Sequence, residues 1–233
     1  SGTVTLQSGA CTQGQGHETV FKQIVADKIG ISLNEINYVW GDTDKVAFGH
    51  GTGGSRSSAL GGSAVNMATD KVIEKAIKIA AHNLEAAPED IELSEGLFTV
   101  VGTDRNISFI DVAKAAVNPN SIPKNMEPGI NEQATFTADM MNYPNGCHIC
   151  ELEIDPDTGI IEILKYSVVD DVGTVMNPLL LKGQIMGGIM QGVGQALMED
   201  VAYDESGQLI TGSFMDYGMP RADNMSYMDI QSN

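Results

Sequence analysis

The chain has 233 residues, of which 42% are hydrophobic and 19% are charged, so it can bury a sizeable core and is not a disordered protein. Its 13 Lys and Arg and 31 Asp and Glu give a net charge of −18, which argues against nucleic acid or an anionic membrane as the main partner. Three cysteines are too few for a disulfide scaffold, and the 26 glycines suggest many close backbone approaches.

Apolar periodicity predicts the elements of the first half of the chain. Residues 3–8 alternate like a strand, and residues 17–29 place apolar side chains on one helical face, which Gly30 is suited to end. Residues 36–40 form a second strand, and a long helix is predicted from about residue 59 to residue 86.

The middle of the chain alternates short elements with turns. Three strands are predicted over residues 90–108, with turns at 94–96 and 104–106, and a short helix is predicted over 111–117. Four prolines over residues 118–146 indicate that this stretch is mainly loop.

The last third is predicted to contain a hairpin of residues 147–154 and 160–169, a helix over 178–199 and a final hairpin around 204–207. Residues 216–233 show weak patterning. This mixture of helices and hairpins predicts an α+β fold, in which mixed sheets with hairpins pack against helices, rather than a doubly wound parallel sheet.

Residues 178–198 are the nearest approach to a membrane span. Lys182 and three glutamines interrupt them, whereas a span needs about 18 or more apolar residues. We therefore predict a buried helix and no membrane span.

The first residues show no basic segment followed by an apolar run, so no signal peptide is visible and the cytoplasm is the expected compartment.

Residues 49–54 match the spelling G-x-G-x-x-G of a dinucleotide-binding turn. That fold needs the glycines directly after a strand and an acidic residue about 20 positions later, at the end of a second strand. The preceding strand ends near Trp40 and the candidate acid, Glu74, falls inside the long helix, so this fold is excluded. A P-loop is excluded as well, because no Gly-Lys-Ser/Thr follows the glycines.

The same loop could still bind an anion, because residues 53–58 lead directly into the long helix. A helix N-terminus offers free N–H groups and partial positive charge, and Arg56 adds a bidentate fork suited to phosphate. The alternative interpretation is an N-capping serine beside a solvent-exposed arginine. A second loop, residues 13–16, also precedes a helix, so two donor-lined edges could hold a large anionic ligand.

Two further patterns could indicate binding. Gln184, Gln191 and Gln195 share one stripe of the helix predicted over 178–199, where either a heterocyclic ligand or a polar seam between helices would satisfy their amides. Cys147 and Cys150 spell C-x-x-C, but residues three apart on a strand point to opposite faces. We interpret these cysteines as structural thiols rather than as metal ligands.

Four long segments carry a family resemblance: GQGHETVFKQIVADKIGI (14–31), GDTDKVAFGHGTGGSRSS (41–58), VVDDVGTVMNPLLLKGQIMGGIMQGVGQALMED (168–200) and GSFMDYGMPRAD (212–223). In this order and spacing they resemble the large, molybdopterin-binding subunit of the molybdenum hydroxylases. This family comprises xanthine dehydrogenases, aldehyde oxidoreductases and carbon monoxide dehydrogenases. The resemblance extends from the start of the chain to about residue 225.

The resemblance implies an oxidoreductase that hydroxylates an aldehyde, an N-heterocycle or carbon monoxide with oxygen derived from water. It implies a molybdopterin that carries molybdenum, in the cytosine dinucleotide form, with iron–sulfur centres and FAD on partner subunits or domains. The implied partners are a small-molecule substrate, the iron–sulfur and flavin subunits and the rest of the large subunit. In this family the pterin dithiolene holds the metal, so no protein ligand to it is expected.

Three groups of residues would contact the cofactor according to this resemblance. The first group would lie along the pterin and its metal end: Gln13, Gly14, Gln15 and Gly16. The second group would cradle the pterin or its phosphates: Thr52, Gly53, Ser55, Arg56 and Ser57. The third lies on the later helix, from which Gln184 would reach the pterin, with Gln191 as a further candidate.

The resemblance assigns no catalytic residue within the chain. The family base is a glutamate in a Gly-x-Gly-Glu motif, which is expected beyond Asn233, and the similar residues 192–195 end in Gln. We therefore expect residues 1–233 to be a truncated, partial cofactor domain, with possible sub-lobes 1–140 and 141–233, that is inactive alone. The alternative is a pterin-binding or isolated folding unit without turnover.

Overall fold

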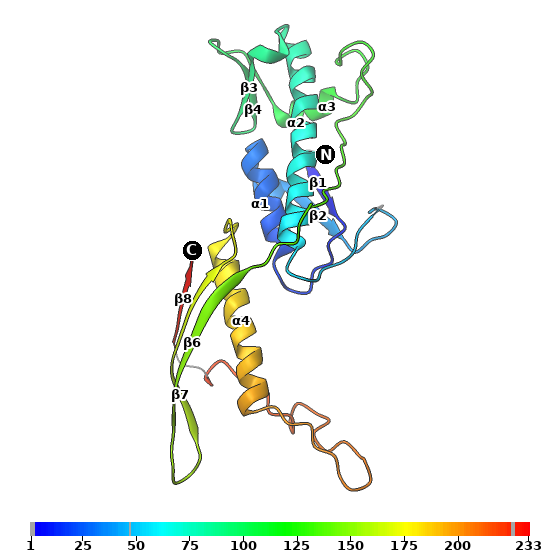
Figure 1. The fold of residues 1–233 in the computed structure, drawn as a ribbon. Helices are drawn as coiled ribbons and strands as arrows, with labels where there is room; N and C mark the ends of the chain where they lie inside the picture. Colours follow the sequence, from blue (N-terminus) through cyan, green and yellow to red (C-terminus); the bar gives the residue numbers. More distant parts are fainter. Residues whose placement is uncertain (1–2, 47, 225–226) are drawn as a thin grey trace. The chain divides into compact units, whose positions relative to one another are not determined.

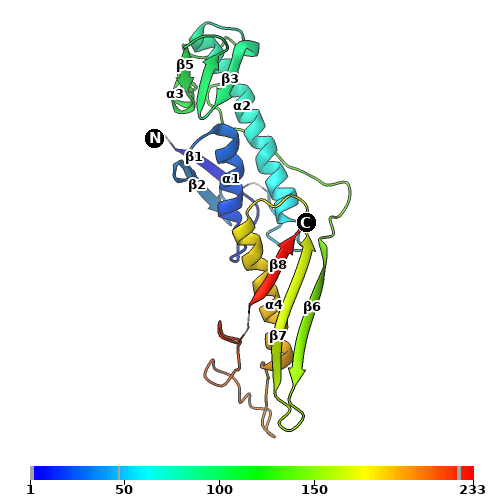
Figure 2. The same ribbon diagram turned by 90° about the vertical axis from the view of Figure 1, so that its left-hand side faces the viewer.

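The computed structural model describes residues 3–46, 48–224 and 227–233 (Figures 1 and 2). The chain divides into two compact units, the first ending at Asn142 and the second starting at Tyr143. Helices and small sheets occur in both units, and the sheet of the second unit is mixed, which confirms the predicted α+β class.

The first unit begins with a two-stranded parallel sheet and the helix that connects its strands. Strand β1 (Val4–Ser8) pairs with β2 (Ile36–Trp40), and helix α1 (His17–Ile29) lies between them in sequence. Gly30 ends α1 as predicted, since its φ of 79° lets its N–H bond to the carbonyl oxygen of Ala26 at 2.7 Å.

The long predicted helix is observed as a π-helical turn, Ser58–Gly62, followed by α2 (Ser63–Leu84). Small residues allow this helix to approach α1, because a Cβ at Gly61 would lie only 2.8 Å from the Phe21 ring. The N-termini of α1 and α2 are therefore part of one packed unit.

Three antiparallel strands follow: β3 (Ile91–Ser94), β4 (Leu97–Val100) and β5 (Asn106–Ser108). The turn predicted at 104–106 was placed too late, because the chain turns over 101–104 and Asn106 already pairs with Thr99. Helix α3 (Phe109–Ala115) also begins two residues before its predicted start, since the Ser108 hydroxyl caps it by accepting the Asp111 N–H at 3.1 Å.

The first unit has one continuous apolar core, to which its helices and the faces of its strands contribute. The largest fully buried side chains of this core are Phe21, Ile29, Ile36, Ile79, Phe98 and Val112. This core fixes the N-terminal ends of α1 and α2, and the glycine-containing loops that precede both helices are attached to it.

The second unit is built on the predicted hairpin, which is observed as β6 (Asn145–Ile154) and β7 (Ile161–Asp171). The sequence did not predict β8 (Met228–Ser232), which pairs in parallel with β7 and completes a three-stranded sheet (Figure 2). The final hairpin predicted around 204–207 is reduced, within the described residues, to a turn closed by a single Tyr203–Leu209 bridge.

Helix α4 (Pro178–Leu197) packs one side on this sheet through a small core of Val168, Ile189 and Met228. The prediction that this helix is buried was wrong, because only Ile189 and Gly194 are buried and most of its residues are exposed. Across residues 3–46, 48–224 and 227–233, none of the helices is long and apolar enough to cross a membrane.

Exposed apolar side chains on the β6–β7 hairpin are expected to make the chain self-associate despite its charge of −18. Leu152 pairs across the strands with Ile163, and Ile154 pairs with Ile161; Leu152 is 49% exposed and Ile154 is 55% exposed. In sedimentation velocity the sedimentation coefficient should rise with concentration. Replacing Leu152 and Ile161 by threonine should suppress this rise, whereas Leu33→Thr in the first unit should not. A single monomeric species across a wide concentration range would contradict the expectation.

Candidate functional site

The two glycine loops predicted from sequence lie against each other in the first unit. The first loop covers residues 9–16 and the second covers residues 48–57. A Cβ at Gly9 would lie 2.3 Å from the carbonyl oxygen of Phe48, and a Cβ at Gly49 would lie 2.3 Å from that of Gly9. Because no side chain fits at either glycine, the loops are in direct backbone contact.

A side-chain link joins the same two loops at a second point. The Thr52 hydroxyl donates to the carbonyl oxygen of Cys11 at 2.5 Å, and the Ser57 hydroxyl donates to the Thr52 hydroxyl at 3.3 Å. The Cys11 side chain lies beside Gly51, where a Cβ would be 3.9 Å from the Cys11 Cβ. Thr52 therefore bonds the second loop to the first, and Ser57 supports Thr52 from within the second loop.

The first loop presents two glutamines that are paired with each other. Gln15 donates its Nε2 to Gln13 Oε1 at 2.7 Å and accepts the Gln13 backbone N–H at 2.5 Å. Gly14 and Gly16 take left-handed conformations, with φ of 101° and 82°. Gly16 is the N-cap of α1 and provides no capping side chain, so the first-turn N–H groups of α1 have no side-chain acceptor there.

His17, the first residue of α1, is buried behind this loop. Its ring stacks on Phe21 at a centroid distance of 5.5 Å and is only 5% exposed. Its Nδ1 is buried and has no hydrogen-bond partner among the described residues. Burial lowers the pKa of His17, so its imidazole is neutral at pH 7. The His17 ring is therefore packed on the core of the first unit.

This burial predicts a pH dependence of stability. Above about pH 6.5 the imidazole is neutral in both states; below that pH the unfolded chain takes up the proton more readily, so the unfolding free energy falls. Urea unfolding of His17→Gln should therefore show a shallower loss of stability between pH 7 and pH 5 than the parent chain. His82→Gln, at an exposed position, is the matched control for the substitution itself. A parental slope in His17→Gln would refute the prediction.

The second loop directs its donors outward. Gly53 and Gly54 have no atom within 4 Å of an added Cβ, and Ser55 has a left-handed φ of 52°. Arg56 is exposed, and its guanidinium has no hydrogen-bond or ion-pair partner within the described residues. Asn142 steadies the loop by donating its Nδ2 to the Ser55 carbonyl oxygen at 3.1 Å. The second loop therefore offers a donor set suited to phosphate: open glycine backbone, serine hydroxyls and a free guanidinium, all before a helix.

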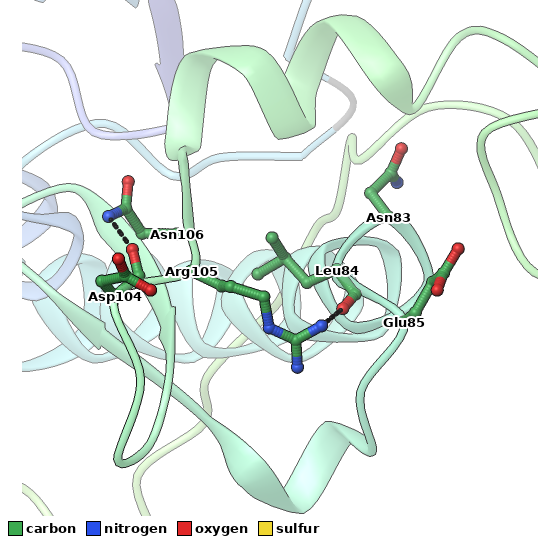
Figure 3. A pocket seen from close by; sticks show the side chains of 6 residues that line it. All are labelled: Asn83, Leu84, Glu85, Asp104, Arg105 and Asn106. Carbon is green, nitrogen blue, oxygen red and sulfur yellow. Dashed lines mark hydrogen bonds between the residues drawn. The ribbon is translucent and has the colours of Figure 1, made fainter.

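Two surface depressions lie elsewhere in the first unit, and none of the predicted site residues lines them. The one in Figure 3, of about 510 Å³, is at the end of α2, where Arg105 Nη1 donates to the Leu84 carbonyl oxygen at 2.9 Å. This contact caps the helix, so Arg105 has a structural role. The other, of about 290 Å³, is mainly apolar and lies between Val4, Ile31 and Phe109.

Gln184 and Gln191 belong to the second unit, on the exposed face of α4. The glycines of that face, Gly183, Gly187, Gly188 and Gly192, have no atom within 4 Å of an added Cβ, so the helix backbone is open to close approach. The structure thus brings the first two groups of predicted residues together in one unit and places the third group in the other.

Cys147 and Cys150 lie on β6 as predicted, opposite Val169 and Tyr166 of β7. The sequence did not predict a hydrogen-bonded group of three polar side chains next to these cysteines. His148 lies 3.2 Å from Asp170 through Nε2 and 3.2 Å from the Tyr166 hydroxyl through Nδ1. In the part of the chain that the structure describes, no three His, Cys, Asp or Glu side chains are placed to hold a metal ion.

Comparisons with known proteins identify the family of this chain. The model of the molybdopterin cofactor-binding domain family matches residues 1–226. The 6-hydroxypseudooxynicotine dehydrogenase complex subunit gamma of Paenarthrobacter nicotinovorans is 43% identical over 98% of this chain and 29% of its own length. The carbon monoxide dehydrogenase large chain of Afipia carboxidovorans is 37% identical over 95% of this chain and 27% of its own length.

The fold is also similar to solved structures. The crystal structure of quinoline 2-oxidoreductase from Pseudomonas putida 86 superimposes with a TM-score of 0.86 at 34% identity, over 99% of this chain and 30% of that chain. This chain therefore spans less than a third of the length of the relatives it matches. Because the family model covers nearly the whole sequence, the chain belongs to the molybdopterin cofactor-binding domain family of the molybdenum hydroxylase large subunits.

Proposed function

We propose that the two glycine loops form the phosphate- and pterin-binding edge of a molybdopterin cytosine dinucleotide site in a molybdenum hydroxylase. The observation that carries this proposal is the contact of the two loops, which sets the N-terminus of α1 beside donors that have no protein partner. A cofactor with phosphates and a pterin ring needs this combination of donors.

The donors of the second loop fit the phosphates. Arg56 would pair with phosphate oxygens through its two-pronged guanidinium, and the Ser55 hydroxyl would add a neutral donor. The Ser57 hydroxyl donates to Thr52 and would reach a phosphate only by leaving that bond. The backbone at Gly53 can approach a ligand closely, because no atom lies within 4 Å of an added Cβ. These residues would hold and orient the cofactor and would not enter the reaction.

The glutamines fit the pterin. Gln13 and Gln15 bond each other, so a ligand with matching donors and acceptors would replace one satisfied amide pair by another at little net cost. Gly14 and Gly16 have no side chain that would block the approach of the pterin. The family resemblance assigns further amides to Gln184 and Gln191, which lie on the exposed face of α4.

The proposed activity is oxidative hydroxylation of an aldehyde, an N-heterocycle or carbon monoxide. When bound, the cofactor would supply a molybdenum centre that accepts electrons from the substrate and delivers oxygen derived from water. We assign no general base to a side chain of these 233 residues. Electrons would leave through iron–sulfur and FAD centres on partner subunits, and the assembly would work in the cytoplasm.

The test uses a complete large subunit that contains this sequence, expressed with its partner subunits. The protein should contain about one molybdenum and one acid-releasable cytosine nucleotide per subunit. In ¹⁸O-labelled water it should transfer the label to quinoline, benzaldehyde or carbon monoxide. Cofactor without turnover of any of the three would support the non-catalytic alternative, and absence of both metal and nucleotide would refute the site.

A further inference from the structure

We infer that Thr52 is a positioning residue that clasps the two glycine loops together and is not itself a ligand of the cofactor. This inference refines the proposed function, on which the second part of its test depends. The family resemblance placed Thr52 among the residues that cradle the cofactor, but the hydrogen bonds of its hydroxyl favour another role.

The first argument is the donor capacity of the hydroxyl. A threonine has one O–H, and in Thr52 this O–H is used in a bond of 2.5 Å to the Cys11 carbonyl oxygen. The same Thr52 oxygen accepts a hydrogen bond from the Ser57 hydroxyl. Thr52 could donate to a phosphate only by releasing Cys11, which would detach the first loop from the second.

The second argument is position. Thr52 is half-buried, whereas the neighbouring donors Gly53, Ser55 and Arg56 are exposed. The residues that face solvent are thus the ones available to a ligand, and the residue that faces the other loop is Thr52. Its side chain points into the contact between the loops.

The third argument is mechanical. The Gly9–Gly49 contact joins the loops at one point, and a single contact leaves them free to rotate about it. The Thr52–Cys11 bond adds a second point further along each loop, so it restrains the separation of the loops and their rotation about the first contact. The first loop then continues into α1 and the second into the π-helical turn before α2. The clasp therefore keeps the donors at the two helix N-termini in one arrangement.

The first part of the test needs no cofactor. The chain has three cysteines, so Cys147→Ser with Cys150→Ser leaves Cys11 as the single thiol. Its half-buried side chain lies beside Gly51, so modification by an aromatic disulfide reagent should report loop opening. Thr52→Val keeps the branched shape and removes the hydroxyl, and it should raise the labelling rate about tenfold. Thr52→Ser restores the hydroxyl and should stay within about twofold of the parent.

Two controls separate a local clasp from general damage. The exposed Thr5→Val should leave the labelling rate unchanged. In low concentrations of urea, the Thr52→Val rate should be insensitive to denaturant, as expected for local rather than global opening. Parental labelling in Thr52→Val would overturn the clasp, and so would equal rates for Thr52→Val and Thr52→Ser.

The second part uses the complete subunit with its cofactor. Thr52→Val should lower the cytosine nucleotide content about tenfold, and Thr52→Ser should restore it. Loss of nucleotide in Thr52→Val with unchanged Cys11 labelling would show a direct ligand role and overturn the inference. If the parent subunit contained no nucleotide, the proposed function would fail, while the labelling result would still decide on the clasp.

Discussion

Replacing Gly9 by alanine is expected to force the two glycine loops apart and to lower the unfolding free energy of the first unit by about 2–3 kcal/mol. The added Cβ would lie 2.3 Å from the carbonyl oxygen of Phe48 and 2.6 Å from the Cα of Gly49, so backbone must move. Urea unfolding measures the loss of stability, and hydrogen exchange of residues 49–52 measures the separation of the loops.

Gly53→Ala is the matched control, because it lies in the same loop with no atom within 4 Å of its added Cβ. It should unfold within about 0.5 kcal/mol of the parent. If Gly9→Ala were as stable as Gly53→Ala, with parental exchange over 49–52, the backbone contact between the loops would be wrong.

Arg56→Ala in a complete, cofactor-containing subunit is expected to lower cofactor content without affecting the fold. Loss of a bidentate contact to phosphate should cost about 1.5–3 kcal/mol of binding, which is roughly a ten- to a hundredfold weaker site. Molybdenum and cytosine nucleotide per protein measure this loss, alongside the melting temperature of cofactor-free protein. Arg56→Lys keeps the charge but not the fork and should recover only part of the affinity.

Arg105→Ala is the contrasting variant, which should lose stability without losing cofactor. Its guanidinium caps α2 through the Leu84 carbonyl oxygen, so its removal should cost about 1 kcal/mol of stability and leave cofactor content per folded protein unchanged. Unchanged cofactor in Arg56→Ala would refute the phosphate assignment, and a large loss of apo stability would show that Arg56 is structural.

Elements with strong local signals were predictable from the sequence. Gly30 ends α1 where expected, because a left-handed C-cap is a property of a few adjacent residues. The Asp155–Gly159 turn likewise made the β6–β7 hairpin predictable. The glycine loops were recognisable as two donor-rich segments, each of which precedes a helix.

The features that the sequence missed depend on distant partners. Strand β8 is only five residues long, and its pairing with β7 joins residues about 60 positions apart. The exposure of α4 could not be derived from its composition, since burial of a Gly- and Met-rich helix depends on what packs against its second face. The Gly9–Gly49 contact is also long-range, and no residue near either glycine signals the other.

The parallel pairing of β8 with β7 has a consequence for biosynthesis. Met228 completes the small core with Val168 and Ile189, so the β6–β7 hairpin and α4 are synthesised before their last core residue has been made. At about 5–20 residues per second, synthesis from residue 168 to residue 228 leaves the apolar side of that hairpin uncovered for several seconds. During this interval the nascent second unit should be a target for chaperones that bind exposed apolar strands, whereas the first unit can fold as soon as residue 142 has emerged.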